Sequence, residues 1–275
     1  MKIFGGKLTI SAAIGILIIL VCVGASALAP WIAPHDPNAL MGQRWEGPSA
    51  AHWFGLDQLG RDMFSRMLYG GRISISLALL ATLLAFAVGI VAGFAAAIFG
   101  GWVDILLSRI ADVVLSIPIL MSALIVISGF GTSATMLVLT IGLLYAVVVF
   151  RVARAVAMNI VVLEYVEAAR LRGEGLMWVV WREILPNALP PLAAEFGLRF
   201  CFAFLFIAAL SFLGLGLEPP DADWGSMVKE SALAIPSGIA APLYPAAAIA
   251  LLTIGVNMVV DWLLSLHSRP HGDNA

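Results

Sequence analysis

Long stretches without any charged residue constrain the fold of this chain more than any other feature of its sequence. Five of them stand out: residues 8–35, 73–103, 113–150, 200–217 and 231–260. A charge at the centre of a bilayer costs about 2.5–3.5 kcal/mol on insertion scales, so runs of this length are typical of membrane-spanning helices. Charged residues make up only 12% of the chain, against about 25% in an average soluble domain. The pattern excludes a soluble fold, and the 61% hydrophobic content excludes a disordered one.

The third run is too long to be a single span. As one helix, residues 113–150 would reach about 57 Å, whereas the hydrocarbon core of a bilayer is about 30 Å thick. Gly129 and Gly131 supply a turn near its middle, and we expect Pro118 to kink the helix before that turn. The sequence thus predicts an all-α integral membrane protein with six transmembrane helices. Their expected positions are about 8–28, 73–98, 110–128, 133–152, 191–212 and 243–266.

An even number of spans places both chain termini on the same side of the membrane. If that side is the cytoplasm, the inner segments carry ten Lys and Arg residues and the outer segments five. The positive-inside rule therefore predicts cytoplasmic termini. The first run has a second interpretation, because Lys2, Lys7 and the small residues Ala25-Ser26-Ala27 resemble a cleavable signal peptide. Its apolar stretch is longer than in ordinary signal peptides, which favours an uncleaved anchor helix.

Composition and motifs also bound the chemistry of the chain. The 17 acidic and 15 basic residues give a net charge of −2, so no basic excess indicates a nucleic-acid partner. Cys22 and Cys201 lie inside apolar runs without a CxxC pair, so we interpret them as inert packing residues. The histidines lie outside the expected spans, with His35 and His52 scattered along an outer segment. Because HExxH and GxSxG motifs are also absent, the sequence predicts no metal site, no cofactor and no catalytic residue.

The charged residues nearest to the expected third span are candidates for a functional role, because charges in a membrane span are costly to keep there. Asp104, Arg109 and Asp112 have spacings that allow local pairing along one helix. We interpret them as structural anchors at the cytoplasmic face, with a role in gating as the alternative. No acidic residue falls in the middle of a span, which disfavours a proton-coupled carrier.

The connection after the first span, residues 29–71, is rich in proline and tryptophan. This composition predicts an irregular segment near the membrane interface. Residues 60–69 would place apolar side chains on one face of a helix and polar side chains on another, which predicts a short amphipathic helix. We expect it to end at Gly70-Gly71. That helix would brace the next span, with direct contact to a substrate as the alternative.

The connection between the fourth and fifth spans, about residues 153–190, is rich in arginine. Leu163–Arg172 is predicted to be helical, with glutamates early, arginines late and Gly173 as its terminator. A second short helix is expected from Leu176 to Leu185, ending at Pro186. Two interpretations remain open: another protein surface could approach the small residues closely, or the arginines could lie on anionic lipid headgroups.

At this loop the sequence resembles a known family. Glu167-Ala168-Ala169, Gly173 and Leu185-Pro186 have the spacing of the EAA loop of ABC importer permeases, although Glu183 stands where isoleucine is common. In that family the loop forms a coupling helix that sits in a groove of the ATPase. The resemblance implies six ATPase-coupling residues: Glu167, Ala168, Ala169, Gly173, Leu185 and Pro186.

Two further segments resemble the second permease subunit of dipeptide, oligopeptide and nickel importers. They are His52–Asp62 and Ser211–Pro220, the latter followed by Trp224-Gly225, with Ala222 replacing a common proline. The three motifs occur in the family's order, and the resemblance covers nearly the whole chain. Their candidate site residues on the outer side are Gly60, Arg61, Asp62, Gly214, Gly216, Pro219, Pro220 and Trp224.

The resemblance implies a type I ABC importer permease fold in the bacterial cytoplasmic (inner) membrane. An N-terminal part, residues 1–71, would hold the anchor helix and outer segment. A permease domain, 72–268, would contain the cytoplasmic loop 153–190, and a cytoplasmic tail, 269–275, would follow. Implied partners are a second, homologous permease subunit, two cytoplasmic ATPase subunits, and a periplasmic or lipid-anchored substrate-binding protein.

In this arrangement the chain forms half of the translocation path for di- or oligopeptides. Nickel chelates, opines and oligosaccharides are alternative cargoes, and a non-transporting membrane scaffold is the alternative of a different class. The chain carries no phosphate-binding loop of its own, because such a loop needs Gly-Lys followed by Ser or Thr. Its lysines Lys2, Lys7 and Lys229 are followed by Ile3, Leu8 and Glu230. ATP hydrolysis is therefore expected in partner subunits.

Overall fold

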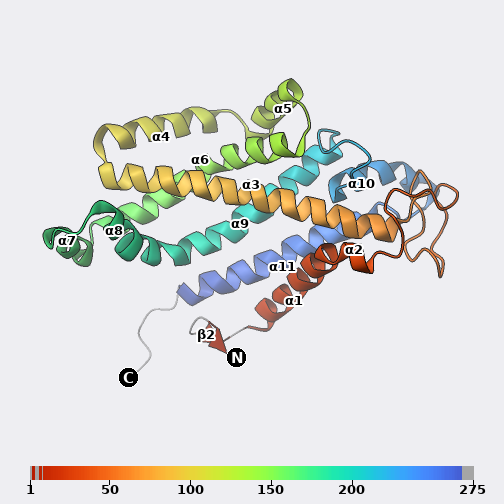
Figure 1. The fold of residues 1–275 in the computed structure, drawn as a ribbon, viewed down its shortest axis with the longest axis horizontal. Helices are drawn as coiled ribbons and strands as arrows, with labels where there is room; N and C mark the ends of the chain where they lie inside the picture. Colours follow the sequence, from red (N-terminus) through yellow and green to blue (C-terminus); the bar gives the residue numbers. More distant parts are fainter. Residues whose placement is uncertain (1, 4–5, 8, 268–275) are drawn as a thin grey trace.

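The computed structural model describes residues 2–3, 6–7 and 9–267, and these are predominantly helical. Five long helices run along the molecule in Figure 1: α1 (Ile10–Ala27), α3 (Met63–Phe99), α6 (Ala134–Val161), α9 (Leu185–Phe212) and α11 (Leu243–His267). The shorter elements are α2 (Ala29–Ile32), α4 (Gly101–Ser116), α5 (Ile119–Phe130), α7 (Glu164–Leu171), α8 (Leu176–Val179), the π-helical turn η1 (Val180–Ile184), α10 (Trp224–Ser231), the 3₁₀ helix η2 (Ala232–Ser237) and the paired strands β1 (Lys2–Ile3) and β2 (Gly6–Lys7). The expected tail, 269–275, lies outside the described residues.

The described residues contain five helices that could cross a membrane, and the six expected spans are reached if one bent pair of helices counts as a span. α1, α3, α6, the helical stretch Leu176–Phe212 and Leu243–Leu266 of α11 are each long and apolar enough to cross a bilayer. α4 and α5 pass the same test as a pair, bent by 84°. The bend falls at Ile117, whose ψ is 130°, because a residue before proline is pushed out of the helical region. The kink at Pro118 is confirmed, but the single helix expected at 110–128 is replaced by two shorter ones.

α3 does not stop at Gly70-Gly71, which corrects the expectation of a short separate helix. Asp62 caps its start, accepting a hydrogen bond at 2.8 Å from a backbone N–H of the first turn. The glycine pair serves close packing instead. A Cβ at position 71 would lie 2.5 Å from the indole ring of Trp224 and would also collide with the Ser26 hydroxyl. The glycines thus let α1 and α10 approach α3.

The helix after α7 also continues where an end was expected. It does not stop at Pro186, because α8, η1 and α9 follow one another without a break to Phe212. Proline lacks an N–H donor, and its ring crowds the carbonyl four residues earlier. The wider π-helical turn directly precedes Pro186, and Pro190 and Pro191 lie inside α9. A proline here modifies the helix and does not terminate it.

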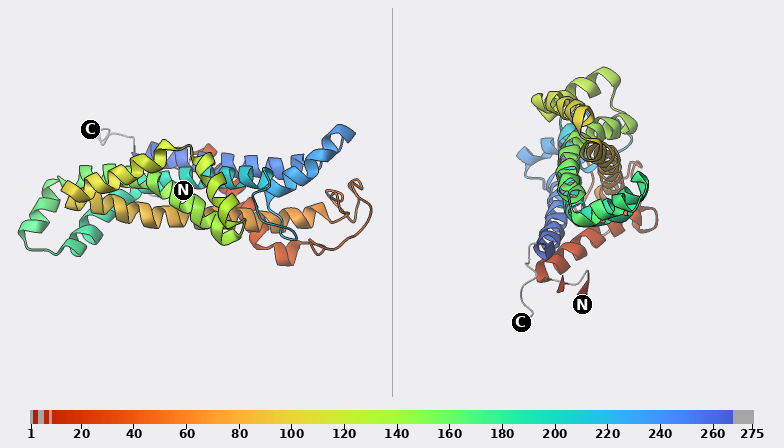
Figure 2. Two further views of the ribbon diagram at one scale, coloured as in Figure 1. Left: turned by 90° about the horizontal axis from the view of Figure 1, so that it is seen from above. Right: turned by 90° about the vertical axis from the view of Figure 1, so that its left-hand side faces the viewer.

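The core of the bundle is centred on the contact between α3 and α6. A Cβ at Gly89 would lie 2.6 Å from the Cβ of Val149, and one at Gly93 would lie 2.8 Å from that of Ala153. Small residues four apart allow this close approach of two spans. α1 packs on α11 in a similar way, since a Cβ at Gly15 would lie 2.6 Å from a backbone oxygen of α11. Figure 2 shows this α1–α11 pair along one edge of the bundle.

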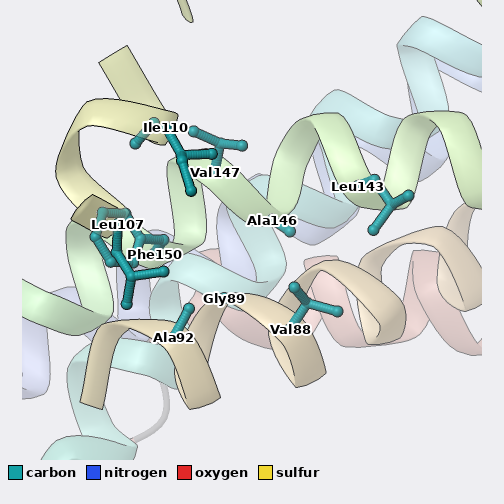
Figure 3. A pocket seen from close by; sticks show the side chains of 10 residues that line it. Val88, Gly89, Ala92, Leu107, Ile110, Leu143, Ala146, Val147 and Phe150 are labelled. Atoms are coloured by element: carbon teal, nitrogen blue, oxygen red, sulfur yellow. The ribbon is translucent and has the colours of Figure 1, made fainter. Parts of the chain in front are cut away.

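A hollow remains where α4 meets the α3–α6 pair. Figure 3 shows apolar side chains from these three helices around it, among them Val88, Leu107 and Phe150. Its volume is about 240 Å³, and its lining residues are all apolar. Such a space offers water no hydrogen-bond partner. We interpret it as a packing gap between helices and not as a path for polar cargo.

Candidate coupling loop and motif cluster

The EAA segment lies on α7 and divides between the surface and the interior. Glu167 and Ala168 are exposed, whereas Ala169 is fully buried, as is Val166 one turn earlier. Both buried residues belong to the same hydrophobic cluster as Ile184 of η1. Ala169 therefore packs inside its own loop. Of the three residues in the segment, Glu167 and Ala168 are the ones that another protein can contact.

Gly173 ends α7 as the sequence predicts. Its φ is +83°, in the left-handed region. The Gly173 N–H donates to the Arg170 carbonyl at 2.9 Å, and the Glu174 N–H donates to the Ala169 carbonyl at 3.2 Å. These two bonds make a Schellman C-cap. Because no atom of the described residues, apart from those adjoining Gly173 in the chain, lies within 4 Å of where a Cβ at this position would be, the need for glycine comes from the backbone conformation alone.

Leu185 and Pro186 begin α9 next to this loop. Leu185 is half-buried against the core, and Pro186 is exposed. Large apolar side chains around them face outward, with Leu171 82% and Trp181 62% exposed. Exposed basic residues lie among these apolar groups: Arg170, Arg172 and Arg182. We call residues 164–186, which hold the candidate coupling residues, the coupling loop; its surface combines apolar side chains with charges of both signs, since Glu164 and Glu167 are exposed as well.

At the opposite end of the molecule (Figure 1), buried arginines join the connection before α3 to α10. Arg61 Nε donates to Asp57 Oδ2 at 2.7 Å, and Arg66 Nε lies 3.2 Å from the same oxygen. Both guanidinium groups also reach Glu230 Oε2, at 3.3 and 3.2 Å. Since charges are buried at low cost only when they are paired, these four residues fix the connection onto the helices. We call them, with Asp62, the motif cluster.

Asp62 is fully buried and contacts a histidine. His52 Nδ1 lies 2.9 Å from Asp62 Oδ1, and the rings of His35 and His52 are 5.0 Å apart between centroids. Gly60 turns the chain into this region with a φ of +79°, where a Cβ would collide with the Gly42 carbonyl. The two histidines expected to be scattered are therefore brought together, because the connection folds back on itself.

Trp224 anchors α10 to α3. It is only 3% exposed, its indole N–H donates to the Met67 carbonyl at 2.8 Å, and its backbone N–H donates to Ser74 Oγ at 2.9 Å. Trp224 also packs edge-on against Phe204 of α9. The side chain thus ties three elements together, which gives this motif residue a structural role.

The motif before Trp224 forms the turn between α9 and α10. Gly214 has a φ of +90°, a Cβ at Gly216 would lie 2.6 Å from the Ser211 Cβ, and the Pro219–Pro220 bond is cis. The turn lines a cavity of about 400 Å³ that also contains the charged side chains of Glu218, Lys229 and Glu230. Unlike the gap in Figure 3, this cavity offers polar contacts to a bound molecule.

Asp223 caps α10 from a buried position. Its Oδ1 accepts hydrogen bonds from the N–H groups of Gly225 and Ser226, at 2.9 and 3.1 Å, and its own N–H donates to Ser226 Oγ at 3.1 Å. Its Oδ2 makes no hydrogen bond among the described residues. Burial raises the pKa of this carboxyl above its ordinary value, although the bonds from Ser226 oppose the rise.

Near the coupling loop, the acids of α4 pair across to α6 and not along their own helix. Arg154 binds Asp104 through two nitrogens, with Nη2 at 2.6 Å from Oδ2, and Arg151 Nη2 donates to Asp112 Oδ1 at 2.7 Å. This corrects the expected local pairing with Arg109. The two ion pairs hold α4 against α6.

Sequence reasoning missed several members of the motif cluster. Asp57 and Arg61 have the i,i+4 spacing of a helical ion pair, and that was the one local signal available. Glu230 lies 164 residues beyond Arg66 in the chain. Such a pairing is visible only once the fold is known.

Known proteins similar to this chain are transport permeases. The chain is 35% identical over 263 residues to the probable D,D-dipeptide transport system permease protein DdpC of Escherichia coli, covering 95% of this chain and 87% of that protein. It is 34% identical to the dipeptide transport system permease protein DppC of Alkalihalophilus pseudofirmus (92% and 83% covered). It is 31% identical to the glutathione transport system permease protein GsiD of Pectobacterium atrosepticum (90% and 83% covered).

A solved structure and a family profile agree with these relatives. The crystal structure of an amino acid ABC transporter with histidines matches 71% of this chain and 89% of its own, at 20% identity and a TM-score of 0.50, which supports the fold. Residues 85–269 match the family described as binding-protein-dependent transport system inner membrane component. That match includes the coupling loop and Gly214–Trp224. This multi-pass membrane chain therefore belongs to the binding-protein-dependent transport permeases, the membrane subunits of ABC importers.

Proposed function

We propose that the chain forms half of the translocation path for di- or oligopeptides in an ATP-driven importer of the bacterial cytoplasmic membrane. The relatives that cover most of both chains carry names of dipeptide, D,D-dipeptide and glutathione transport. The polar cavity beside Gly214 and Gly216 supports this class of cargo, because its Glu218 and Lys229 side chains provide charges of both signs for a zwitterionic molecule.

The observation that carries the proposal is the exposed face of α7. Glu167 and Ala168 lie on a short helix that a Schellman cap holds rigidly at the end of the bundle, surrounded by exposed apolar groups such as Leu171. An apolar patch with a small residue at its centre suits a close contact with another protein. In the proposed importer this face docks onto a cytoplasmic ATPase subunit, which hydrolyses ATP for the chain.

The remaining partners follow from the same proposal. A second, homologous permease subunit supplies the other half of the path, a second ATPase subunit binds that permease, and a periplasmic or lipid-anchored binding protein delivers the peptide. The chain itself binds no nucleotide and catalyses no reaction. Its lack of a Gly-Lys-Ser/Thr sequence supports this division of labour.

Substitution of Ala168 by tryptophan tests the docking face. The importer is purified in mild detergent through the permease, and the co-purified ATPase is quantified. Because overpacking a close contact costs about 1–3 kcal/mol, Ala168→Trp should lower ATPase binding by roughly tenfold and reduce dipeptide uptake into proteoliposomes. Ala50→Trp, the same change at an exposed alanine at the other end of the molecule, is the matched control and should retain the ATPase.

The lipid interpretation of the loop predicts the opposite pattern. Replacing Arg170, Arg172 and Arg182 by glutamine would then abolish dipeptide uptake, while the Ala168→Trp variant would bind the ATPase and transport dipeptides normally. That outcome would refute the coupling assignment. Cargo is tested separately with labelled dipeptides, a nickel chelate and an oligosaccharide in the same proteoliposomes; uptake of either alternative without dipeptide uptake would refute the peptide assignment.

A further inference from the structure

Three potential metal ligands meet where the connection before α3 folds back on the helix. One ligand atom each from His35, His52 and Asp62 lies within 4.8 Å of the other two. His35 is held in place by its backbone N–H, which donates to Ser65 Oγ at 3.2 Å. The histidines are half-buried and the aspartate is fully buried. The site is therefore accessible from one side and closed on the other.

The charge of Asp62 is not balanced by the neighbouring arginines. Arg61 and Arg66 are both engaged with Asp57 and Glu230. Among the described residues, the partner that Asp62 has in an ion pair is His52. As the N-cap of α3, the buried carboxylate accepts the Ser65 N–H at 2.8 Å, and a cation beside it would compensate its charge further. A metal ion held between Asp62 and the two histidines would be such a cation.

We propose that His35, His52 and Asp62 bind a divalent zinc-class metal ion. Imidazole nitrogen and carboxylate oxygen are ligands that Zn²⁺ prefers, at about 2.0–2.2 Å. Two donors on one tetrahedral ion are then roughly 3.4 Å apart. The donor distances, none above 4.8 Å, reach this value with side-chain shifts on the order of 1 Å. Three protein ligands leave a fourth position for water or another donor.

The ion would cross-link three positions that are separated in the chain. His35 lies near the start of the connection, His52 near its end, and Asp62 is the cap of α3. Binding all three would fix a proline-rich segment, residues 33–62, whose described backbone forms turns and isolated β-bridges but no helix or strand. This inference does not depend on the cargo or on the coupling loop.

Zinc titration of the full purified chain tests the site. The protein carries an affinity tag without histidines and is first treated with a chelator, and Zn²⁺ is then added in a calorimeter. We expect one equivalent to bind, and His35→Gln should weaken its affinity by at least about tenfold. His267→Gln, at the end of α11, is the matched control and should bind as the unsubstituted chain does.

A second variant separates the metal from the simple ion pair. Asp62→Asn keeps a good N-cap for α3 but removes the charged ligand, so it should fold and lose zinc affinity. Bound Zn²⁺ should also slow proteolysis within residues 36–51 of the unsubstituted chain and not of this variant. Absence of stoichiometric zinc binding to the unsubstituted chain, or an affinity in His35→Gln and Asp62→Asn equal to that of the unsubstituted chain, would overturn the proposal and leave a hydrogen-bonded His52–Asp62 pair.

Discussion

Burial of the Asp223 carboxylate predicts that the stability of the chain depends on pH. Its raised pKa means that the protonated form is more favourable in the folded chain than in the unfolded chain. The stability that this group contributes is therefore fully present below the ordinary aspartate pKa, about 3.9, and is lost as the pH rises through the higher folded value. Asp223→Asn keeps an acceptor for the cap of α10. It should unfold at a higher temperature than the unsubstituted chain at pH 7.5, with the gap closing towards pH 4.

Thermal unfolding in detergent between pH 4 and 8 measures this difference. Asp221→Asn, an exposed aspartate two residues earlier, is the control and should leave the pH profile unchanged. A lower unfolding temperature for Asp223→Asn at pH 7.5 would contradict the argument, because it would mean that α10 needs the negative charge at its N-terminus.

Glycines show what a sequence can and cannot reveal about single residues. Gly173 follows a helical stretch with arginines near its end, and its prediction as a terminator is confirmed. Gly70 and Gly71 follow a similar amphipathic stretch, yet the helix continues through them. The difference is Trp224, which occupies the space that a side chain at position 71 would need. Only a partner distant in the chain decides between the two uses of glycine.

The C-cap of α7 predicts that a substitution at Gly173 destabilises the helix end through backbone conformation and not through a steric clash. Both Gly173 and Gly175 have open space where a Cβ would be added, but only Gly173 has a positive φ; that of Gly175 is −68°. Gly173→Val should therefore destabilise the loop by about 1–3 kcal/mol, whereas Gly175→Val, at the N-cap of α8, should cost less and leave the end of α7 undisturbed. Gly173→Asn should recover part of the loss, because asparagine tolerates the left-handed region.

Hydrogen exchange of the α7 amides, together with co-purification of the ATPase, measures the outcome. Faster exchange and weaker ATPase binding are expected in Gly173→Val alone. Equal changes in both valine variants would show that side-chain bulk, and not backbone conformation, disturbs the loop.

Hydropathy predicts the existence of the spans and one end of each, and the positions of charges and prolines mislead it elsewhere. α3 ends within a residue of the expected 98 but begins at Met63 and not at 73, and α6 begins within a residue of the expected 133 but continues to Val161 and not 152, because both helices run on past arginines. Proline has opposite consequences in the two remaining cases: Pro118 separates α4 from α5 by 84°, whereas Pro186 is absorbed after a π-helical turn. Pro118 and Pro186 both lack a backbone N–H donor, so this local property does not distinguish them. The surrounding helices determine whether the chain bends or continues as a helix.

At the scale of the whole molecule, the two groups of motif residues lie at opposite ends of the bundle (Figure 1). The resemblance supplied the candidate residues at each end, and the order of the spans follows from the sequence. The pairing of Arg61 and Arg66 with Glu230, and the meeting of His35 with His52, did not follow. These contacts join segments that local pattern cannot relate, because the fold itself creates them.

The arrangement of the helices also predicts on which side of the membrane each end of the bundle lies. In Figure 1, α3 and α6 both run towards the end that holds the coupling loop, and α4 and α5 carry the chain back between them. If that bent pair is a full span, three spans separate Leu40 from Leu171, and the two residues lie on opposite sides. If it were a re-entrant loop, two spans would separate them and they would lie on the same side, but α3 and α6 would then run in opposite directions and not in the same one. We expect the first arrangement, with Leu171 in the cytoplasm, because basic residues concentrate at that end.

In a background with Cys22 and Cys201 replaced by alanine, a membrane-impermeant maleimide added to intact cells should label Leu40→Cys, since Leu40 is 71% exposed. Leu171→Cys, at 82% exposure, should react only after permeabilisation. Labelling of both from outside would exclude α4–α5 as a span, and the reverse pattern would invert the proposed orientation.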